Sequence, residues 1–429
     1  MLETEERSTT RAWVLHPDIK DRSSPDHSRR DAPEALAEAV ALAVALPGLD
    51  VVGDEVVPLP KTRAGTLFGS GKIEELKHRF HDNEVELVLI DGPVTPVQQR
   101  NLEKEWKVKI LDRTGLILEI FSDRAATREG VLQVELAALS YQRTRLVRAW
   151  THLERQRGGL GFVGGPGETQ IEADRRAIDE RINKIKNQLD KTVKTRELHR
   201  AARAKVPFPI VALVGYTNAG KSTLFNRLTG ADVMVKDMLF ATLDPTMRSV
   251  ELPDGVEIIM SDTVGFISDL PTQLVAAFRA TLEEVLSADL ILHVRDISHA
   301  ETDNQATDVR AILADLGVDQ EIKTLEVWNK LDKLDGNDHE SLSNIAARDD
   351  SIFLTSAVTG AGMGPLLEAI SREVTEATTT EDMLLPFSEG KKRAWLFDQE
   401  VVDQEDATED GFALSVTWSA KQKARFDKL

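Results

Sequence analysis

A glycine-rich stretch at residues 215–222 (GYTNAGKS) fits the pattern G-x-x-x-x-G-K-[ST]. Its residue types suit phosphate groups: the glycines let successive backbone N–H groups turn toward phosphate oxygens, the lysine adds a positive charge, and the serine hydroxyl can ligate Mg²⁺. The apolar run 209–214 before it predicts a buried strand, and residues 222–228 after it have helical spacing. Strand, loop and helix in this order predict a phosphate-binding loop (P-loop) rather than a glycine turn without a ligand.

Three later motifs, each directly after a predicted strand, indicate which nucleotide binds. Residues 262–265 (DTVG) match D-x-x-G, in which the aspartate reaches Mg²⁺ through water and the glycine N–H contacts a γ-phosphate. Residues 329–332 (NKLD) match N-K-x-D, and Asp332 can accept hydrogen bonds from guanine N1–H and the exocyclic amine, which adenine does not offer. Residues 356–358 (SAV) can complete the base pocket with a backbone N–H to guanine O6. Together the four motifs predict a domain that binds and hydrolyses GTP.

Residues 240–246 (FATLDPT) lie between the first two motifs and are the candidate switch I. Switch I must offer a threonine to Mg²⁺ and the γ-phosphate. Both Thr242 and Thr246 are available. Many GTPases carry a water-orienting glutamine directly after D-x-x-G, but this chain has Phe266, which cannot orient a nucleophile by hydrogen bonding. We therefore expect slow intrinsic GTP hydrolysis that is stimulated when a partner orders the switches.

The form of switch I resembles that of Obg-like GTPases, and alignment on it selects Thr242. Residues 112–118 (DRTGLIL), 132–137 (LQVELA) and 164–172 (GGPGETQIE) are more specifically similar to the HflX family, and this resemblance covers residues 35–375. It implies a GTPase that binds the ribosome, chiefly the large subunit near the peptidyl-transferase centre. It further implies an action on translation or ribosome state, either splitting or rescue of stalled or stressed ribosomes or subunit biogenesis.

The expected site combines these motifs. Catalytic roles fall to Lys221, Thr242 and Gly265, and Mg²⁺ is expected on Ser222 and Thr242 directly and on Asp262 through water. Asn218 stands where potassium-activated relatives carry an asparagine that helps to hold K⁺, so stimulation by K⁺ is an open question. The predicted nucleotide-binding residues are Gly215, Tyr216, Thr217, Asn218, Ala219, Gly220, Lys221, Ser222, Thr223, Phe240, Ala241, Thr242, Leu243, Asp244, Asp262, Thr263, Val264, Gly265, Asn329, Lys330, Leu331, Asp332, Ser356, Ala357 and Val358.

The elements that position the site predict an α/β protein in five parts. The parts are a partly flexible N-terminus (1–31) with a strand at 12–15, an N-terminal parallel α/β domain (32–136), a helical hairpin with a glycine-rich tip (137–206), a Ras-like P-loop G domain (207–375), and a linker with a small C-terminal α+β domain (376–429). In the last part we expect a polar linker at 375–382, a helix near 389–398, an acidic loop at 404–410, a strand at 412–418 and a terminal helix.

A second glycine-rich stretch, residues 65–72 (GTLFGSGK), lies in the N-terminal domain. Its spacing differs from that of a P-loop, and Ile73 rather than serine or threonine follows its lysine. It therefore predicts a glycine turn that caps the helix 73–81. A second nucleotide near residues 69–72 stays an alternative.

Charge is distributed unevenly along the 429 residues. The chain carries a net charge of −19, yet residues 141–205 hold sixteen Lys and Arg against eight Asp and Glu, a net +8. The glycine-rich tip at 157–167, flanked by Arg155 and Arg157, fits a crowded RNA surface, because glycines allow close backbone approach and arginines pair with phosphate. The basic hairpin 141–205 is therefore expected to contact ribosomal RNA, and the alternative is a structural arm with a solvated basic face.

The amino-acid composition excludes several other kinds of functional site. The chain has no cysteine, which excludes disulfides, thiol nucleophiles and cysteine-ligated metals, and its nine histidines show no H-E-x-x-H pattern. The most apolar stretch, 35–46, is too short to span a bilayer, so no stable membrane insertion is expected. A cytoplasmic monomer is the simplest expectation. The alternative function is a regulatory GTPase switch with a protein rather than a ribosomal partner.

Overall fold

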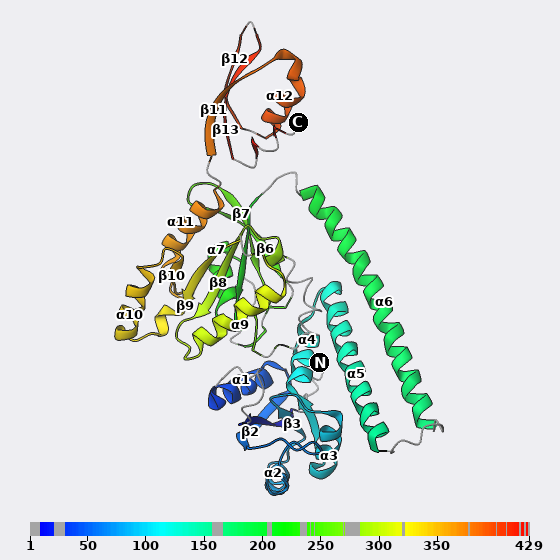
Figure 1. The fold of residues 1–429 in the computed structure, drawn as a ribbon. Helices are drawn as coiled ribbons and strands as arrows, with labels where there is room; N and C mark the ends of the chain where they lie inside the picture. The colour runs from blue at the N-terminus through cyan, green and yellow to red at the C-terminus, as the bar shows by residue number, and fades with distance from the viewer. Residues whose placement is uncertain are drawn as a thin grey trace, which may run out of the picture. The chain divides into compact units, whose positions relative to one another are not determined.

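The computed structural model describes residues 9–20, 31–156, 166–203, 208–231, 238–240, 242–243, 245–268, 270, 284–319, 322–375, 378–399, 401–408, 410–419, 422–423 and 426–427 (Figure 1). The chain divides into two compact units. One unit comprises Met1–Glu251 and Glu257–Pro365, and the other comprises Leu252–Val256 and Leu366–Leu429. Each unit is described by itself.

The first sheet has four parallel strands in the order β2-β1-β3-β4, which confirms the parallel α/β class predicted for the N-terminal domain. The predicted start at residue 32 was wrong, because β1 is longer than the expected strand 12–15 and is an inner strand of this sheet. Its elements are β1 (Thr10–Ile19), α1 (Ala32–Ala45), β2 (Leu49–Leu59), α2 (Ser70–Asp82), β3 (Leu87–Ile90), α3 (Pro96–Trp106), β4 (Lys109–Asp112) and α4 (Arg113–Arg124). Aromatic side chains fill the core beneath α2 and α3, where the Phe80 ring lies 5.8 Å from Trp13 and 5.1 Å from Trp106, centroid to centroid. Apolar burial of this kind is the main stabilising contribution.

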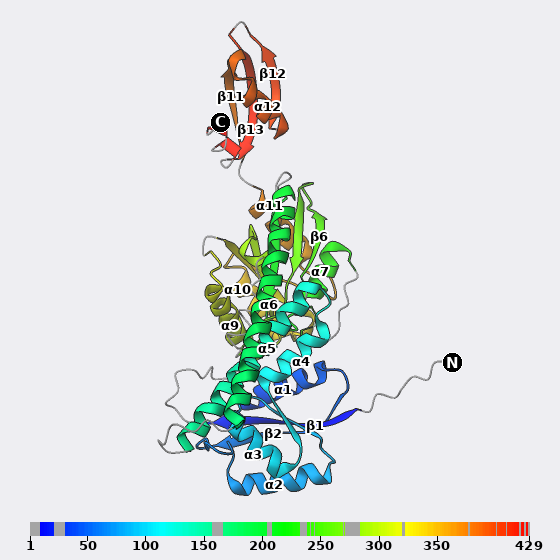
Figure 2. The ribbon, with the colours of Figure 1, turned by 90° about the vertical axis from the view of Figure 1, so that its right-hand side faces the viewer.

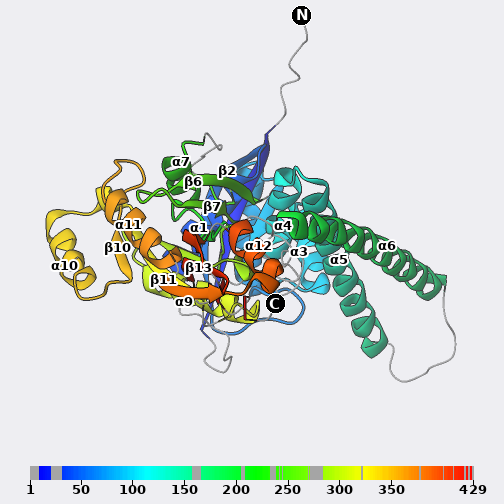
Figure 3. The same ribbon diagram turned by 90° about the horizontal axis from the view of Figure 1, so that it is seen from above.

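Two long helices, α5 (Arg128–Gln156) and α6 (Pro166–Arg203), form the predicted hairpin and run along each other (Figures 2 and 3). Ion pairs join them: Arg181 Nη2 lies 2.6 Å from Glu135 Oε1, and Arg143 Nε lies 3.1 Å from Asp179 Oδ1. Ile182 of α6 is buried. The glycine-rich tip at 157–165 lies outside the described residues, and so do the side chains of Arg155 and Arg157. No helix within the described ranges is long and apolar enough to cross a membrane.

The second sheet has six strands in the order β10-β9-β8-β5-β7-β6, and all neighbours are parallel except β6 and β7. Its elements are β5 (Ile210–Gly215), α7 (Lys221–Thr229), β6 (Thr246–Glu251), β7 (Glu257–Asp262), β8 (Leu290–Asp296), α9 (Thr302–Asp315), β9 (Lys323–Asn329), η1 (Leu331–Lys333), α10 (Gly336–Ala346) and β10 (Ile352–Leu354). Strand β5 is central and almost wholly buried, as its unbroken apolar run predicts. Ligand sites in such sheets form at the carboxyl ends of the parallel strands.

The second unit carries a three-stranded antiparallel sheet in the order β11-β13-β12. Its elements are α11 (Met363–Val374), which begins at the end of the first unit, β11 (Thr378–Leu385), η2 (Phe387–Glu389), α12 (Gly390–Asp398), β12 (Val402–Ala407) and β13 (Phe412–Ser419). Most of the region expected to form the terminal helix lies outside the described residues. The α+β character expected for this part is present.

Two expectations for this unit were wrong. The segment predicted as a polar linker, 375–382, enters β11, where Thr380 pairs with Thr417 and their hydroxyl oxygens lie 2.6 Å apart. Threonine is β-branched, so a threonine run favours a strand once a partner strand is present. The predicted acidic loop, 404–410, contains most of β12, which pairs with β13, and Arg393 Nε donates to Glu405 Oε1 at 3.0 Å and offsets its charge.

Candidate functional site

A cavity of about 310 Å³ opens at the carboxyl ends of β5, β7 and β9. It brings together residues from every motif that the sequence assigned to nucleotide binding. They are Thr217, Asn218, Gly220, Lys221, Ser222 and Thr223 after β5, Phe240 and Thr242 from switch I, Thr263 and Gly265 after β7, Asn329, Lys330 and Asp332 at the end of β9, and Ala357 and Val358 after β10. Motifs whose lining residues are as far apart in the chain as Thr217 and Val358 therefore face one space, whose position is the one expected for a ligand in a parallel sheet.

Not every predicted site residue lines this cavity. The predicted residues that are described but do not line the cavity are Gly215, Tyr216, Ala219, Leu243, Asp262, Val264, Leu331 and Ser356. Ala241 and Asp244 fall outside the described residues. Two lining residues were missed, Met238 and Lys333, which stand just before switch I and just after N-K-x-D. A wider window around each motif would have included both.

The P-loop backbone depends on two glycines. Gly215 has φ +152°, and a Cβ there would lie 2.1 Å from Val294 O of β8. Gly220 has φ +94°, and a Cβ there would lie 2.3 Å from Asn329 Nδ2, which itself donates to Ala219 O at 2.9 Å. Only glycine tolerates both the left-handed backbone and the close approach. The asparagine of N-K-x-D thus supports the phosphate loop directly.

Lys221, the first residue of α7, is buried beneath the loop. Its Nζ donates to Tyr216 O at 2.9 Å and to Gly215 O at 3.2 Å. Burial lowers the pKa of Lys221 to about 8, although the nearby Asp262 carboxylate partly opposes that shift. A desolvated ammonium group at a helix N-terminus favours an anionic ligand, because a phosphate replaces the lost hydration with opposite charge.

Three oxygen-bearing side chains meet at the opposite side of the loop. Ser222 Oγ lies 2.7 Å from Asp262 Oδ2 and 2.8 Å from Thr242 Oγ1, and Thr242 Oγ1 lies 3.1 Å from Asp262 Oδ2. Asp262 Oδ1 is buried without a hydrogen-bond partner among the described residues, and burial raises the pKa of this carboxyl. Hydroxyl and carboxylate oxygens are the ligands that Mg²⁺ prefers, and the unsatisfied oxygen fits a metal-bound water. Thr246, the other switch I threonine, begins β6.

The opposite end of the cavity presents groups that suit a guanine base. Asn329 Oδ1 accepts from the Ala357 N–H at 3.0 Å, and the Asp332 carboxylate accepts from Ser356 Oγ at 2.5 Å. Lys330 Nζ lies 2.7 Å from Asp296 Oδ2, which holds the lysine at the rim. These bonds fasten the loops after β9 and β10 to each other. Asp332 retains acceptor capacity for the two donors that distinguish guanine from adenine.

The segment after β7 closes against the P-loop through its backbone. Phe266 N–H donates to Gly215 O at 3.1 Å, and Phe266 O accepts from Thr217 N–H at 2.7 Å. The Phe266 side chain is buried, so it offers no polar atom to a water molecule in the cavity. A Cβ on Gly265 would lie 3.0 Å from Lys221 Nζ, which places the Gly265 backbone next to the ammonium group.

Models of known protein families match the chain in four consecutive segments. Residues 33–122 match the GTP-binding GTPase N-terminal region and residues 124–203 match the GTP-binding GTPase middle region. Residues 210–330 match the 50S ribosome-binding GTPase model, and residues 341–428 match the HflX C-terminal domain. The family models thus match the sheet that carries the motifs and also the regions before and after it in the chain.

Two similar curated proteins carry the same name. The chain is 53% identical over 367 residues to GTPase HflX of Magnetococcus marinus, covering 86% of this chain and 83% of that protein. It is 44% identical over 361 residues to GTPase HflX of Escherichia coli, covering 84% and 83%. A solved GTP-binding protein from Sulfolobus solfataricus in complex with GDP is 24% identical, covers 86% of this chain and 99% of that chain, and has a TM-score of 0.45. By its sequence relatives and its four matched regions, this chain belongs to the HflX family of GTP-hydrolysing enzymes.

Proposed function

We propose that this GTPase acts on the ribosome, binding the large subunit in its GTP-bound state and changing translation or ribosome state. The observation that carries the proposal is the match of residues 210–330, which include most of the residues that line the cavity, to the 50S ribosome-binding GTPase model. The two curated relatives described above are both called GTPase HflX. Splitting or rescue of stalled ribosomes and subunit biogenesis are both compatible with this role, which belongs in the cytoplasm and needs only a monomer.

GTP is proposed to lie along the cavity with its phosphates at the P-loop and its base at Asp332. The N–H groups of Asn218 and of residues 220–223 would bind the phosphates together with the Lys221 ammonium group, and the loop of residues 356–358 would contact guanine O6. Ser222 and Thr242 would hold Mg²⁺ directly and Asp262 would hold it through water, in agreement with the gathered oxygens described above. When bound, Mg²⁺ neutralises charge that develops on the β- and γ-phosphates.

Hydrolysis needs a water molecule placed in line with the γ-phosphate, and this chain lacks the usual glutamine for that task. Phe266 is buried and non-polar, so the chain alone supplies little orientation of the nucleophile. Lys221, Thr242 and the Gly265 N–H stabilise charge and close the site in this proposal. Turnover is therefore expected to be slow until the ribosome orders the switches. The same assay in KCl and in NaCl tests activation by K⁺ through Asn218, which lines the cavity.

The contact with ribosomal RNA is assigned to the basic hairpin, residues 141–205. Its net charge of +8 contrasts with −19 for the whole chain, so attraction to RNA phosphates is local to this segment. Along the described part of α6, exposed basic side chains include Arg175, Lys184 and Lys186. A regulatory switch with a protein partner remains the alternative, and it predicts no preference for ribosomal subunits.

Co-sedimentation with purified large ribosomal subunits tests the proposal. The full chain is expected to pellet with a non-hydrolysable GTP analogue, to pellet weakly with GDP, and to be released as salt is raised. Small subunits and the chain alone serve as controls. Absence of pelleting with the analogue at low salt would contradict ribosome action and favour a protein partner. GTP turnover measured with and without large subunits then tests stimulation.

A further inference from the structure

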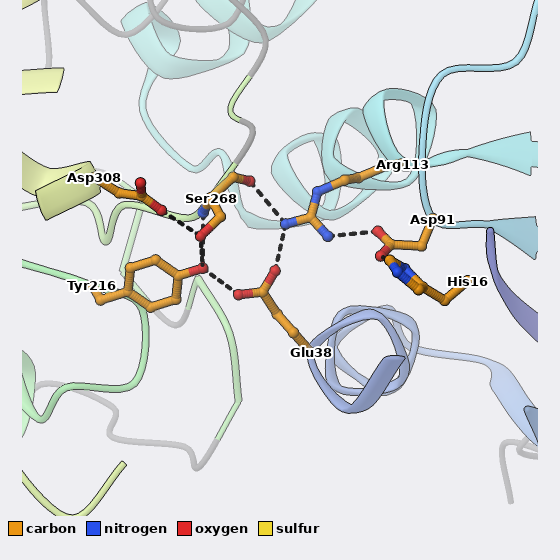
Figure 4. Close-up of polar contacts among 7 residues, drawn as sticks. All are labelled: His16, Glu38, Asp91, Arg113, Tyr216, Ser268 and Asp308. Carbon is orange, nitrogen blue, oxygen red and sulfur yellow. Dashed lines mark hydrogen bonds and ion pairs between the residues drawn. The ribbon is translucent and has the colours of Figure 1, made fainter. Parts of the chain in front are cut away.

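A buried arginine at the start of α4 links the N-terminal domain to the nucleotide site (Figure 4). Arg113 Nη1 donates to Asp91 Oδ1 at 2.6 Å, and Arg113 Nη2 donates to Glu38 Oε1 at 2.5 Å. The same Nη2 lies 2.9 Å from the backbone oxygen of Ser268, three residues after Gly265 of D-x-x-G. Arg113 thus holds the segment that follows the γ-phosphate-sensing glycine.

The Glu38 carboxylate joins this arginine to the P-loop. Its second oxygen, Oε2, accepts a hydrogen bond from the hydroxyl of Tyr216, the second residue of the loop. The Tyr216 hydroxyl also accepts from Ser268 N–H at 2.8 Å and lies 2.8 Å from Ser268 Oγ, which donates to Asp308 Oδ2 at 2.6 Å. The Glu38 carboxylate of α1 therefore joins Tyr216 of the P-loop to Arg113, and both of these residues contact Ser268 after D-x-x-G (Figure 4).

Burial makes these contacts costly to lose. Burial raises the pKa of Asp91, but Arg113 and His16 outweigh it and bring that pKa to about 2. Burial, followed by the Glu38 charge, raises the pKa of Tyr216 well above its ordinary value, so the phenol keeps its proton to donate. A buried ion pair that loses one partner leaves an uncompensated charge, which is strongly destabilising. The network is thus a constrained arrangement rather than a set of solvated surface contacts.

An apolar contact connects α4 to switch I as well. The rings of Phe121 and Phe240 meet edge to face with centroids 4.6 Å apart, and Arg124 Nη2 lies 3.6 Å from Met238 Sδ. Phe240 has φ +55°, an unfavourable value for an aromatic residue that needs support from its surroundings. Helix α4 therefore contacts both segments expected to respond to a γ-phosphate.

We propose that Arg113 and Glu38 are positioning residues of the nucleotide site, acting through Ser268 and Tyr216. Neither residue lines the cavity, so they touch no nucleotide. They favour the arrangement in which Ser222, Thr242 and Asp262 are gathered for Mg²⁺ and a γ-phosphate, and so raise affinity for GTP relative to GDP. This inference rests on the proposed assignment of residues 215–222 as the phosphate loop.

The test measures the affinities of the full chain for a fluorescent non-hydrolysable GTP analogue and for fluorescent GDP, both with Mg²⁺. Two mild variants are used: Tyr216→Phe removes only the hydroxyl, and Glu38→Gln keeps the side-chain shape. Each variant is expected to lower the affinity for the analogue by about fivefold or more, whereas the affinity for GDP is expected to change by less than about twofold. The double variant is expected to bind the analogue no more weakly than the weaker-binding single variant, because both substitutions break the same Tyr216–Glu38 connection.

Lys77→Ala is the matched control, because it breaks a surface ion pair of the same domain, Lys77 Nζ to Glu105 Oε1 at 2.8 Å, and is expected to leave the affinity ratio unchanged. Thermal unfolding of every variant is recorded. A purely structural role would lower the folded fraction and reduce binding capacity for both nucleotides equally, so an unchanged affinity ratio in both variants would overturn the inference. Wild-type protein that binds neither nucleotide would instead refute the proposed function, and the inference with it.

Discussion

At the scale of single residues, the site holds charges at the expense of stability. Lys221 is a buried cation whose lowered pKa reflects lost hydration, and Asp262 is a buried carboxyl with one unsatisfied oxygen. Both conditions are unfavourable in the isolated chain and become favourable once phosphate and metal supply the missing partners. Buried charges and unsatisfied polar atoms of this kind are expected at functional sites rather than in the structural core.

Lys221→Met should therefore separate binding from stability. The substitution removes the buried charge while keeping a side chain of similar length, so the free energy of unfolding without nucleotide is expected to rise by about 1 kcal/mol. Nucleotide affinity should fall by about a hundredfold or more, since a charge-assisted phosphate contact is lost. Urea unfolding and fluorescent nucleotide titration measure the two quantities. A loss of stability together with unchanged affinity would contradict the assigned role of this lysine.

His293, in the middle of β8, predicts a pH dependence of stability. Burial lowers its pKa to about 4, against the opposing charge of Glu326 and with the help of Arg295, Arg310 and Lys221. The unfolded chain binds a proton near pH 6.5, so the stability contribution is complete above that pH and is lost as pH falls toward 4. Between pH 7 and pH 5 the free energy of unfolding of the wild type should fall by up to about 1.4 kcal/mol per pH unit more than that of His293→Gln. Urea unfolding across this range measures both slopes, and equal slopes would contradict the prediction.

At the scale of elements, regular patterns were readable from the sequence, but contacts between distant segments were not. The apolar run before the P-loop predicted β5, and the helical hairpin expected at 137–206 is present as α5 and α6. By contrast, Arg113 contacts Glu38 across 75 positions and Ser268 across 155, and no local pattern encodes such pairs. The same reason explains the errors at β11 and β12, whose polar sequences become strands only beside β13.

The sheet of the second unit depends on the side chain of Trp418 in β13. This indole is 1% exposed and lies 5.1 Å from the Phe426 ring, centroid to centroid. Trp418→Ala should leave a cavity and lower the stability of this unit by about 3 to 5 kcal/mol. Leu384→Ala, at an exposed position of β11, should change it by less than about 0.5 kcal/mol. Hydrogen exchange across β11–β13 measures both effects, and similar protection in the two variants would contradict this account of the core.

At the scale of the whole molecule, charge is arranged so that attraction to a polyanion depends on one segment. Outside the hairpin the chain is strongly acidic, and this acidity opposes non-specific binding to nucleic acid. In the proposed complex with RNA, the acidic remainder would add specificity by repulsion, and the hairpin would provide the attraction. An RNA contact of this kind depends on where the basic residues lie rather than on the net charge.

A charge reversal on α6 tests that argument. Lys184 and Lys186 are exposed, so Lys184→Glu with Lys186→Glu should leave folding intact and weaken pelleting with large ribosomal subunits. If each lysine meets one RNA phosphate, the slope of log affinity against log salt falls by about 1 per lysine. Lys61→Glu with Lys104→Glu, at exposed positions of the N-terminal domain, makes the same change in net charge. Equal weakening by both pairs would mean that net charge, not the hairpin, governs ribosome binding, whereas selective weakening by the α6 pair supports a local RNA contact.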